Sequence, residues 1–387
     1  MKLFTVVLAL VWLAGCASTR QEFTVSPSTL LNDAAFSGYE RVNIESEADV
    51  FGLDAEAKAF VAKAINPMHD PTEQMEDLVE AIFDRADLNL LYMGAANTTA
   101  TQTFHNQAAN CLSLSIMTYA LAKEAGFAVK FQDIEIPEYW TRRDGFSLLN
   151  GHINLRLMPQ HIGNVINLLE TGYEVDFDPQ APRQHFPKRL VGRDTVLAMF
   201  YNNKGADALV NEDYKRAYAY FRAAALTKPT FDSVWVNLAI LYRMTEHYGL
   251  SEKAYEVALK LDPENLTAME NLAFLYANTG RQQQAEELEA VVERRRVNNP
   301  FYHFILGEQA FDEGQLDEAL SHYRDALRLD KSRHEIYFGL AKTYFQMGDI
   351  SRSARYFKQA SMKAFTAEDR HRYNGKLDLL TQRHASL

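Results

Sequence analysis

The sequence predicts an α+β domain followed by an all-α solenoid of helical repeats. The chain has 387 residues, which is too long for one ordinary domain and suggests two or three. Segments of alternating polar and apolar residues between positions 127 and 179 predict a β-sheet. In the far half of the chain, residue types recur every 34 positions, which predicts paired helices stacked side by side.

The composition excludes several classes of protein. Apolar residues make up 47% of the chain and charged residues 24%, so it can bury full cores and is neither a disordered tail nor a fibre. The net charge of −11 argues against nucleic acid as a partner. Two cysteines, Cys16 and Cys111, cannot form a disulfide framework. The sequence holds no metal-ligand spacing and no glycine-rich phosphate loop, so we expect no metal and no cofactor.

The N-terminus reads as a lipoprotein signal peptide over residues 1–15. Lys2 precedes an apolar run, Leu3–Leu13, that is shorter than the roughly 20 residues of a membrane-spanning helix. The run ends in Leu13-Ala14-Gly15-Cys16, which resembles the lipobox of bacterial lipoproteins. The resemblance implies cleavage before Cys16 and attachment of lipid to its sulfur. An ordinary secretory signal with an incidental cysteine is the alternative.

The lipobox resemblance also implies a location for the chain. Lipid on Cys16 would hold the protein at a membrane surface without spanning it. The residue after Cys16 is Ala17 and not an aspartate, and this resembles lipoproteins sorted to the outer membrane. We therefore expect the bacterial cell envelope, with the chain facing the periplasm. Residues 16–45 are rich in serine and threonine and lack a lasting period, which predicts a lipidated tether.

The predicted α+β domain covers residues 46–192 and contains a cysteine at a helix start. Helices are predicted from Asp54 and over residues 71–87. A further helix follows Asn110, a plausible N-cap, and stops near Gly126. Cys111 then lies in the first turn, where unpaired N–H groups and the positive end of the helix dipole favour the thiolate over the thiol.

Two predicted strands downstream carry candidate partners for this cysteine. A first strand is expected over residues 127–131. Residues 151–157 alternate, with His152, Asn154 and Arg156 on one face and apolar residues on the other. Residues 173–179 alternate likewise and place Asp176 and Asp178 on one face. Two neighbouring strands could thus present an imidazole beside a carboxylate.

The order of these motifs resembles that of the transglutaminase-like superfamily, whose Cys-His-Asp arrangement is similar to that of papain-type cysteine proteinases. The resemblance spans roughly residues 50–190. It implies that Cys111 is the nucleophile, His152 the base and Asp178 the residue that orients the imidazole, with Asp176 as the alternative acid. The Cys111 backbone N–H would contribute to the oxyanion hole, with Gln107 as a candidate side-chain donor. The sequence lacks a Trp after His152, which leaves substrate preference open.

The 34-residue period covers five repeats over residues 198–367. One position of the repeat carries aromatic residues and another carries small residues. The small residues let two helices approach closely, and the aromatic ring fills the groove between them. The aromatic register holds Phe221, Tyr255, Tyr323 and Phe357, with Glu289 in the third repeat. The small register holds Gly205, Ala239, Ala273, Gly307 and Ala341.

This pattern is similar to the tetratricopeptide family, which implies a surface that binds a protein partner or substrate. Because Glu289 breaks the aromatic register, the second helix of the third repeat is expected to be longer or to pack more loosely. Residues 368–387 are predicted to form a polar capping helix.

Two functions agree with the sequence. The first is a membrane-anchored cysteine acyltransferase, amidase or peptidase that acts on protein or peptide amides, with the repeats recruiting a partner or substrate. The second is a catalytically silent scaffold lipoprotein that assembles proteins in the envelope. The sequence does not decide between acyl transfer to an amine and hydrolysis, since this depends on how water is excluded.

Overall fold

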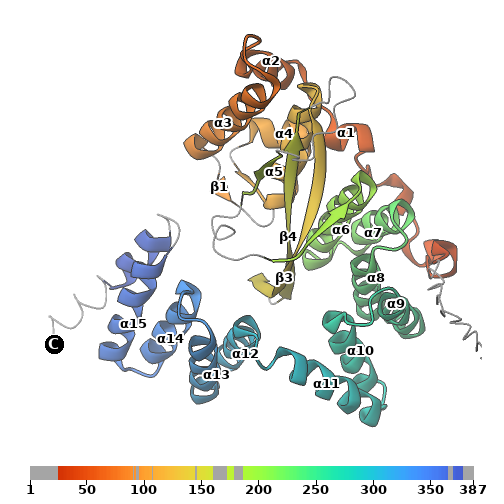
Figure 1. Cartoon of the computed structure of the whole chain (residues 1–387). Coiled ribbons are helices and arrows are strands. Elements are labelled where there is room, and N and C mark those ends of the chain that lie inside the picture. The colour runs from red at the N-terminus through yellow and green to blue at the C-terminus, as the bar shows by residue number, and fades with distance from the viewer. Residues whose placement is uncertain are drawn as a thin grey trace, which may run out of the picture.

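A computed structural model describes residues 25–89, 91–92, 96–106, 108–143, 146–159, 172–177, 186–364 and 369–377. The chain forms an N-terminal α+β unit and a C-terminal arc of paired helices (Figure 1). The predicted signal peptide, Cys16, Gln107 and Asp178 lie outside the described residues. Within the described part, no helix combines the length and the apolar character needed to cross a bilayer.

The main sheet has four antiparallel strands in the order β5-β4-β3-β6. Its strands are β3 (Ala128–Arg143), β4 (Phe146–Met158), β5 (Tyr173–Val175) and β6 (Lys188–Val191). The strands predicted at 127–131 and 151–157 fall in β3 and β4, which pair as a much longer hairpin than the sequence indicated. A second, parallel pair joins β1 (Leu91–Tyr92) to β2 (Ala108–Ala109).

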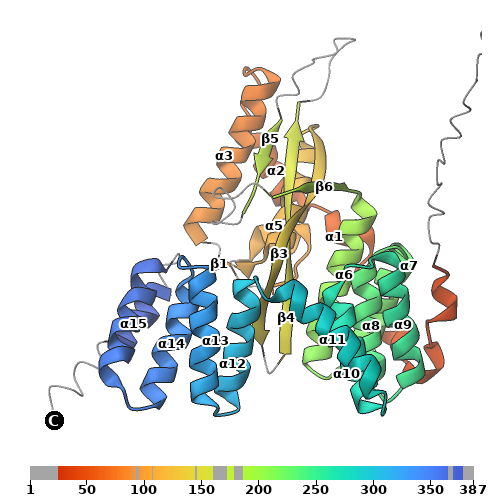
Figure 2. The ribbon, with the colours of Figure 1, turned by 60° about the horizontal axis from the view of Figure 1, so that its bottom comes forward.

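Among the described residues, five α-helices precede or accompany this sheet. They are α1 (Glu47–Phe51), α2 (Ala55–Ala64), α3 (Pro71–Asn89), α4 (Ala100–His105) and α5 (Cys111–Glu124). Asp54 caps α2, as the sequence predicted, by accepting the Ala57 backbone N–H at 2.9 Å. Helix α5 packs against β3 and β4. In both views α3 and α6 (Arg193–Val210) lie on opposite sides of the β3–β4 hairpin (Figures 1 and 2).

The segment predicted to be a tether is packed against the solenoid over its described part, residues 25–45. Three short 3-10 helices occur there, η1 (Pro27–Thr29), η2 (Asp33–Phe36) and η3 (Tyr39–Arg41). Phe36 is 6% exposed, and its ring stacks on Tyr218 with centroids 4.3 Å apart. The prediction failed here because a few isolated apolar anchors leave no period in a sequence rich in serine and threonine.

Ten helices form the solenoid, in five antiparallel pairs. The pairs are α6 with α7 (Tyr214–Thr227), α8 (Asp232–Met244) with α9 (Tyr248–Leu261), α10 (Leu266–Asn278) with α11 (Gln282–Arg296), α12 (Pro300–Asp312) with α13 (Leu316–Leu329), and α14 (His334–Gln346) with α15 (Ile350–Lys363). Helices α8, α10, α12 and α14 begin at 232, 266, 300 and 334, which are 34 residues apart. Of the predicted capping helix, the described residues 369–377 are helical.

Small and aromatic residues meet inside these pairs as the repeat pattern predicted. A Cβ atom added to Gly205 would come within 2.5 Å of the Phe221 ring, and one added to Gly307 within 2.7 Å of the Tyr323 ring. Both rings are fully buried. Since a side chain larger than hydrogen would displace the ring, glycine at these two positions sets the spacing of the paired helices.

The solenoid core is interrupted at the third repeat. Buried apolar residues form one continuous cluster from Leu30 to Ala285, whereas those of α12–α15 form separate, smaller clusters. Glu289, which replaces the aromatic residue, is exposed on α11. Helix α11 has 15 residues and the second helices of the neighbouring repeats have 14. The third repeat therefore joins its successor without the usual apolar contact.

The far end of the β3–β4 hairpin lies inside the arc of helices and bridges this interruption (Figure 2). Arg296 at the end of α11 is 2% exposed, and its guanidinium donates to both carboxylate oxygens of Glu138 on β3, at 2.6 and 2.8 Å. Asn299 donates to the Glu138 carbonyl at 2.9 Å. The β3–β4 register shifts between Ile134 and Tyr139, so Glu138 lies in an irregular part of the hairpin, where a side chain can be redirected.

Candidate active site

Cys111 is the first residue of α5, as the capping pattern predicted. The Asn110 side chain accepts the Ser113 backbone N–H at 2.8 Å, which fixes the start of the helix. The cysteine is free and half-buried. Because the first N–H groups of a helix have no intrahelical acceptor, this position places positive electrostatic potential at the sulfur.

The start of α5 is tied to the first helix of the solenoid by buried amides. Asn110 donates from Nδ2 to Oδ1 of Asn97 at 2.7 Å. Asn97 in turn donates from Nδ2 to Oδ2 of Asp207, on α6, at 2.5 Å. Both asparagines are buried. Displacement of α6 would therefore act directly on the N-cap of the helix that carries the cysteine.

His152 on β4 is held by a carboxylate at the end of the neighbouring strand. Its Nε2 lies 2.9 Å from Oδ2 of Asp176, which directly follows β5. Asn154 donates from Nδ2 to the same carboxylate oxygen at 3.0 Å. The antiparallel register pairs Leu155 with Val175, so the next residue pair along the ladder is Asn154 with Asp176. The strand pairing therefore fixes the position of this carboxylate.

The charge state of His152 follows from its neighbours. Burial by itself lowers the pKa of the imidazole, but hydrogen bonds to Asp176 and then to Cys111 outweigh this effect and raise its pKa from 6.5 to about 10. The ring is 6% exposed. Since Asp176 engages Nε2, Nδ1 is left for Cys111. The arrangement holds an imidazolium between a carboxylate and a cysteine at neutral pH.

The structure thus brings together Cys111, His152 and Asp176 out of the four residues proposed from sequence. Asp176 was the second choice for the acid, and it is the carboxylate that meets the ring. Asp178, the first choice, is not among the described residues. Sequence reasoning missed Asn97 and the role of Asn154 as a second donor to the acid. Alternation placed Asn154 beside His152, but nothing in the sequence indicated that this polar row is buried.

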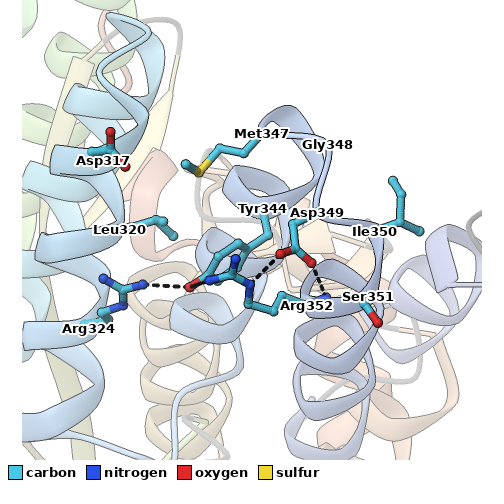
Figure 3. A pocket seen from close by; sticks show the side chains of 10 residues that line it. All are labelled: Asp317, Leu320, Arg324, Tyr344, Met347, Gly348, Asp349, Ile350, Ser351 and Arg352. Atoms are coloured by element: carbon cyan, nitrogen blue, oxygen red, sulfur yellow. Dashed lines mark hydrogen bonds and ion pairs between the residues drawn. The ribbon is translucent and has the colours of Figure 1, made fainter.

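A surface pocket of about 770 Å³ lies away from these residues, between α13, α14 and α15 (Figure 3). Arg324 and Arg352 both donate to the Tyr344 hydroxyl, at 2.7 and 3.5 Å. Asp349 pairs with Arg352 at 2.5 Å. Because Arg352 is already paired with Asp349 and neither a cysteine nor a histidine lines this pocket, we assign it no catalytic chemistry.

Comparison with known families identifies the repeats. Two family models, each described as tetratricopeptide repeat, match residues 232–265 and 254–287, and a third model, described as TPR repeat, matches residues 307–348. All three lie within the solenoid. The prediction of tetratricopeptide repeats is confirmed, and such arrays are protein-interaction surfaces.

Similar curated proteins match over part of the chain. Superkiller protein 3 of Schizosaccharomyces pombe is 23% identical over 164 residues, which are 39% of this chain and 12% of that protein. Human protein O-mannosyl-transferase TMTC3 is 25% identical over 206 residues, which are 49% of this chain and 21% of that protein. The chain thus spans less than a quarter of the length of either relative.

Solved structures show the same partial likeness. MamA AMB-1 is 22% identical with a TM-score of 0.25, and the match covers 44% of this chain and 94% of that one. Yeast Tom70 is 17% identical with a TM-score of 0.30, and the match covers 50% of this chain and 55% of that one.

The raised pKa of His152 predicts a pH dependence of stability. The folded state holds a proton that the unfolded state releases between pH 6.5 and about 10. The stability contributed by this proton is complete below pH 6.5 and is lost as pH rises toward about 10, by up to about 1.4 kcal/mol per pH unit. Asp176→Asn should lower the pKa of His152 and flatten this loss, as measured by denaturant unfolding at pH 7, 8 and 9.

The matched control is Asp77→Asn, which removes the carboxylate from a half-buried pair with His69 outside the site. This variant should keep the slope of the unmodified chain. Equal slopes for Asp176→Asn and the unmodified chain would show that Asp176 does not hold the proton on His152.

Proposed function

We propose that this chain, which carries tetratricopeptide repeats, is a lipid-anchored envelope protein with a transglutaminase-like cysteine site acting on protein or peptide amides. The convergence of Cys111, His152 and Asp176 carries the proposal. The sulfur lies at a helix N-terminus, the ring contacts it, and a carboxylate orients the ring. A structural cysteine needs none of these three arrangements.

The residues supply each part of an acyl-transfer reaction. The Cys111 thiolate attacks the carbonyl carbon of an amide, and the resulting tetrahedral oxyanion is stabilised by N–H groups at the start of α5. His152 then gives its proton to the departing amine as the C–N bond breaks, which leaves a thioester on the sulfur. Water or a second amine, deprotonated by His152, attacks the thioester and releases the thiolate. Asp176 keeps the ring oriented and stabilises its cation throughout.

The solenoid is the substrate- or partner-binding part of this proposal. Its first helix, α6, is hydrogen-bonded through Asp207 and Asn97 to the N-cap of α5. Its third and fourth repeats hold the β3–β4 hairpin through Glu138. Because His152 lies on β4 of this hairpin, a partner that changes the curvature of the repeats would act on both the cysteine and the histidine side of the site.

Lipid attachment at Cys16 would place the first repeats near the membrane. Residues 16–24 can span at most about 30 Å, and the following segment packs on α7 through Phe36 and Tyr218. The anchor would therefore hold the solenoid, and through it the site, close to the outer membrane on its periplasmic side. Cys16→Ser should move the full chain from the membrane fraction to the soluble fraction of the cell. Retention of this variant in the membrane fraction would contradict lipid anchoring.

The rate of alkylation of Cys111 separates an enzyme from a silent scaffold. In the full chain with Cys16→Ser, Cys111 is the single thiol, so labelling by iodoacetamide reports on it alone. Because a helix N-terminus and an adjacent imidazolium activate a thiol toward alkylation, labelling at pH 6 should be about 10-fold or more faster than that of a peptide thiol. His152→Ala should remove this advantage.

His69→Ala is the matched control, because His69 also contacts a carboxylate, Asp77 at 2.9 Å, but at the surface. It should label as fast as the parent chain. A parent chain that labels no faster than the peptide thiol would contradict the proposed nucleophile and favour the scaffold function.

A further inference from the structure

The fourth repeat contains a cluster of metal-binding side chains that is separate from the cysteine site. His303 comes from α12, and His322 and Asp325 come from α13. One ligand atom from each residue lies within 4.8 Å of those of the other two. We propose that these three residues bind a divalent transition-metal ion, Zn²⁺ in the first instance, between the two helices of the repeat.

The strongest support is a pair of ring nitrogens that the fold leaves without partners. Nδ1 of His303 and Nδ1 of His322 are both buried and make no hydrogen bond. A buried polar atom without a partner destabilises a protein, since it has lost its bonds to water. A metal ion coordinated by both lone pairs would satisfy the two nitrogens at once.

The opposite nitrogen of each ring faces an acceptor. His303 donates from Nε2 to the Val297 carbonyl at 2.8 Å, which leaves the lone pair on Nδ1. Nε2 of His322 lies 3.8 Å from Oε1 of Glu318, one turn earlier on α13, which is an ion-pair distance and longer than a hydrogen bond. Histidines that bind metals characteristically donate their second ring nitrogen to a carbonyl or carboxylate, which fixes the tautomer and the ring orientation.

The helix geometry supplies the third ligand. His322 and Asp325 are three residues apart on α13, a spacing that places two side chains on one face of a helix. In a tetrahedral Zn²⁺ site with ligand atoms at about 2.0–2.2 Å from the metal, two ligand atoms lie about 3.3–3.6 Å apart. The three ligand atoms lie within 4.8 Å of one another, so side-chain rotations that bring them closer together would complete the site.

The donor set selects the class of metal. Two imidazoles and one carboxylate suit Zn²⁺ and its neighbours in the transition series, whereas Ca²⁺ and Mg²⁺ prefer sites built from oxygen. Three protein ligands leave a fourth position of a tetrahedral ion for water or for a group from a partner. Asp325 also pairs with Arg328 through Oδ1 at 3.0 Å, and its second oxygen is the one available to the metal.

The location of the cluster means that a bound ion would also affect how the repeats pack. His303 is bonded to the Val297 carbonyl just after α11, and Asn299 beside it is bonded to Glu138 of the hairpin. This is the point where the apolar core of the solenoid is interrupted. A metal that fixes His303 against α13 would stiffen the junction through which the third and fourth repeats hold the β3–β4 hairpin.

Binding of the metal alone tests the proposal. We would use the full chain in detergent with Cys16→Ser and Cys111→Ser, so that no thiol competes for metal, and strip it with a chelator. Calorimetric titration with ZnCl₂ should show one ion per chain, and Co²⁺ should give the visible absorption of a four- or five-coordinate site. Zn²⁺ should also raise the thermal midpoint of unfolding.

His303→Ala and His322→Ala should each weaken Zn²⁺ binding at least about 100-fold, since loss of a ligand exceeds the effect of an outer partner. Asp325→Asn, which preserves side-chain shape, covers the case in which a histidine variant fails to fold, and it should also weaken binding. His371→Ala, which removes an exposed histidine on the described segment 369–377, is the control and should bind as the parent does. Absence of saturable binding, or binding unchanged in all three ligand variants, would overturn the proposal.

Discussion

The hydrogen bond between His152 and Asp176 is the contact on which the proposed chemistry depends. It sets the orientation of the ring, and together with the Cys111 contact it keeps the ring protonated despite burial. Without the carboxylate, a ring that is 6% exposed would favour its neutral form, because burial disfavours the cation. The sulfur would then lose the adjacent positive charge, and only the helix dipole would stabilise a thiolate.

Two sets of polar contacts join the candidate site to the solenoid. The chain of amides from Asn110 through Asn97 to Asp207 joins the cysteine helix to the first repeat. The buried ion pair between Arg296 and Glu138 joins the hairpin to the junction of the third and fourth repeats. The Arg296 guanidinium also pairs with Glu270 at 2.9 Å, and because it is buried its contacts constrain the geometry more than an exposed pair would. The proposed metal site lies beside the same junction.

The sequence predicted what depends on local pattern. The 34-residue period predicted the helix pairs, and capping rules predicted that α5 begins at Cys111 after Asn110. It could not choose between Asp176 and Asp178, because alternation places both on one face and only the pairing of β4 with β5 brings Asp176 to the ring. The length of the β3–β4 hairpin and its irregular part at Glu138 were also missed, since both depend on contacts with α11 and α12 that are distant in sequence.

The packed segment at residues 25–45 and the His303, His322 and Asp325 cluster have the same origin. Each depends on contacts between separate elements, Phe36 with α7 in the first case and α12 with α13 in the second, and neither produces a periodic signal. Sequence patterns therefore located the elements, while the partners of Cys111, Phe36 and His303 required the tertiary structure.

The central claim is that Asp176 keeps the buried His152 ring protonated beside Cys111, and titration of the ring protons by NMR tests it most directly. The difference between the spectra of the full chain and of His152→Ala isolates the signals of this ring. We expect the pKa of the ring to lie well above 6.5, toward about 10, and Asp176→Asn to lower it. A ring that titrates at or below pH 6.5 in the unmodified chain would contradict the claim.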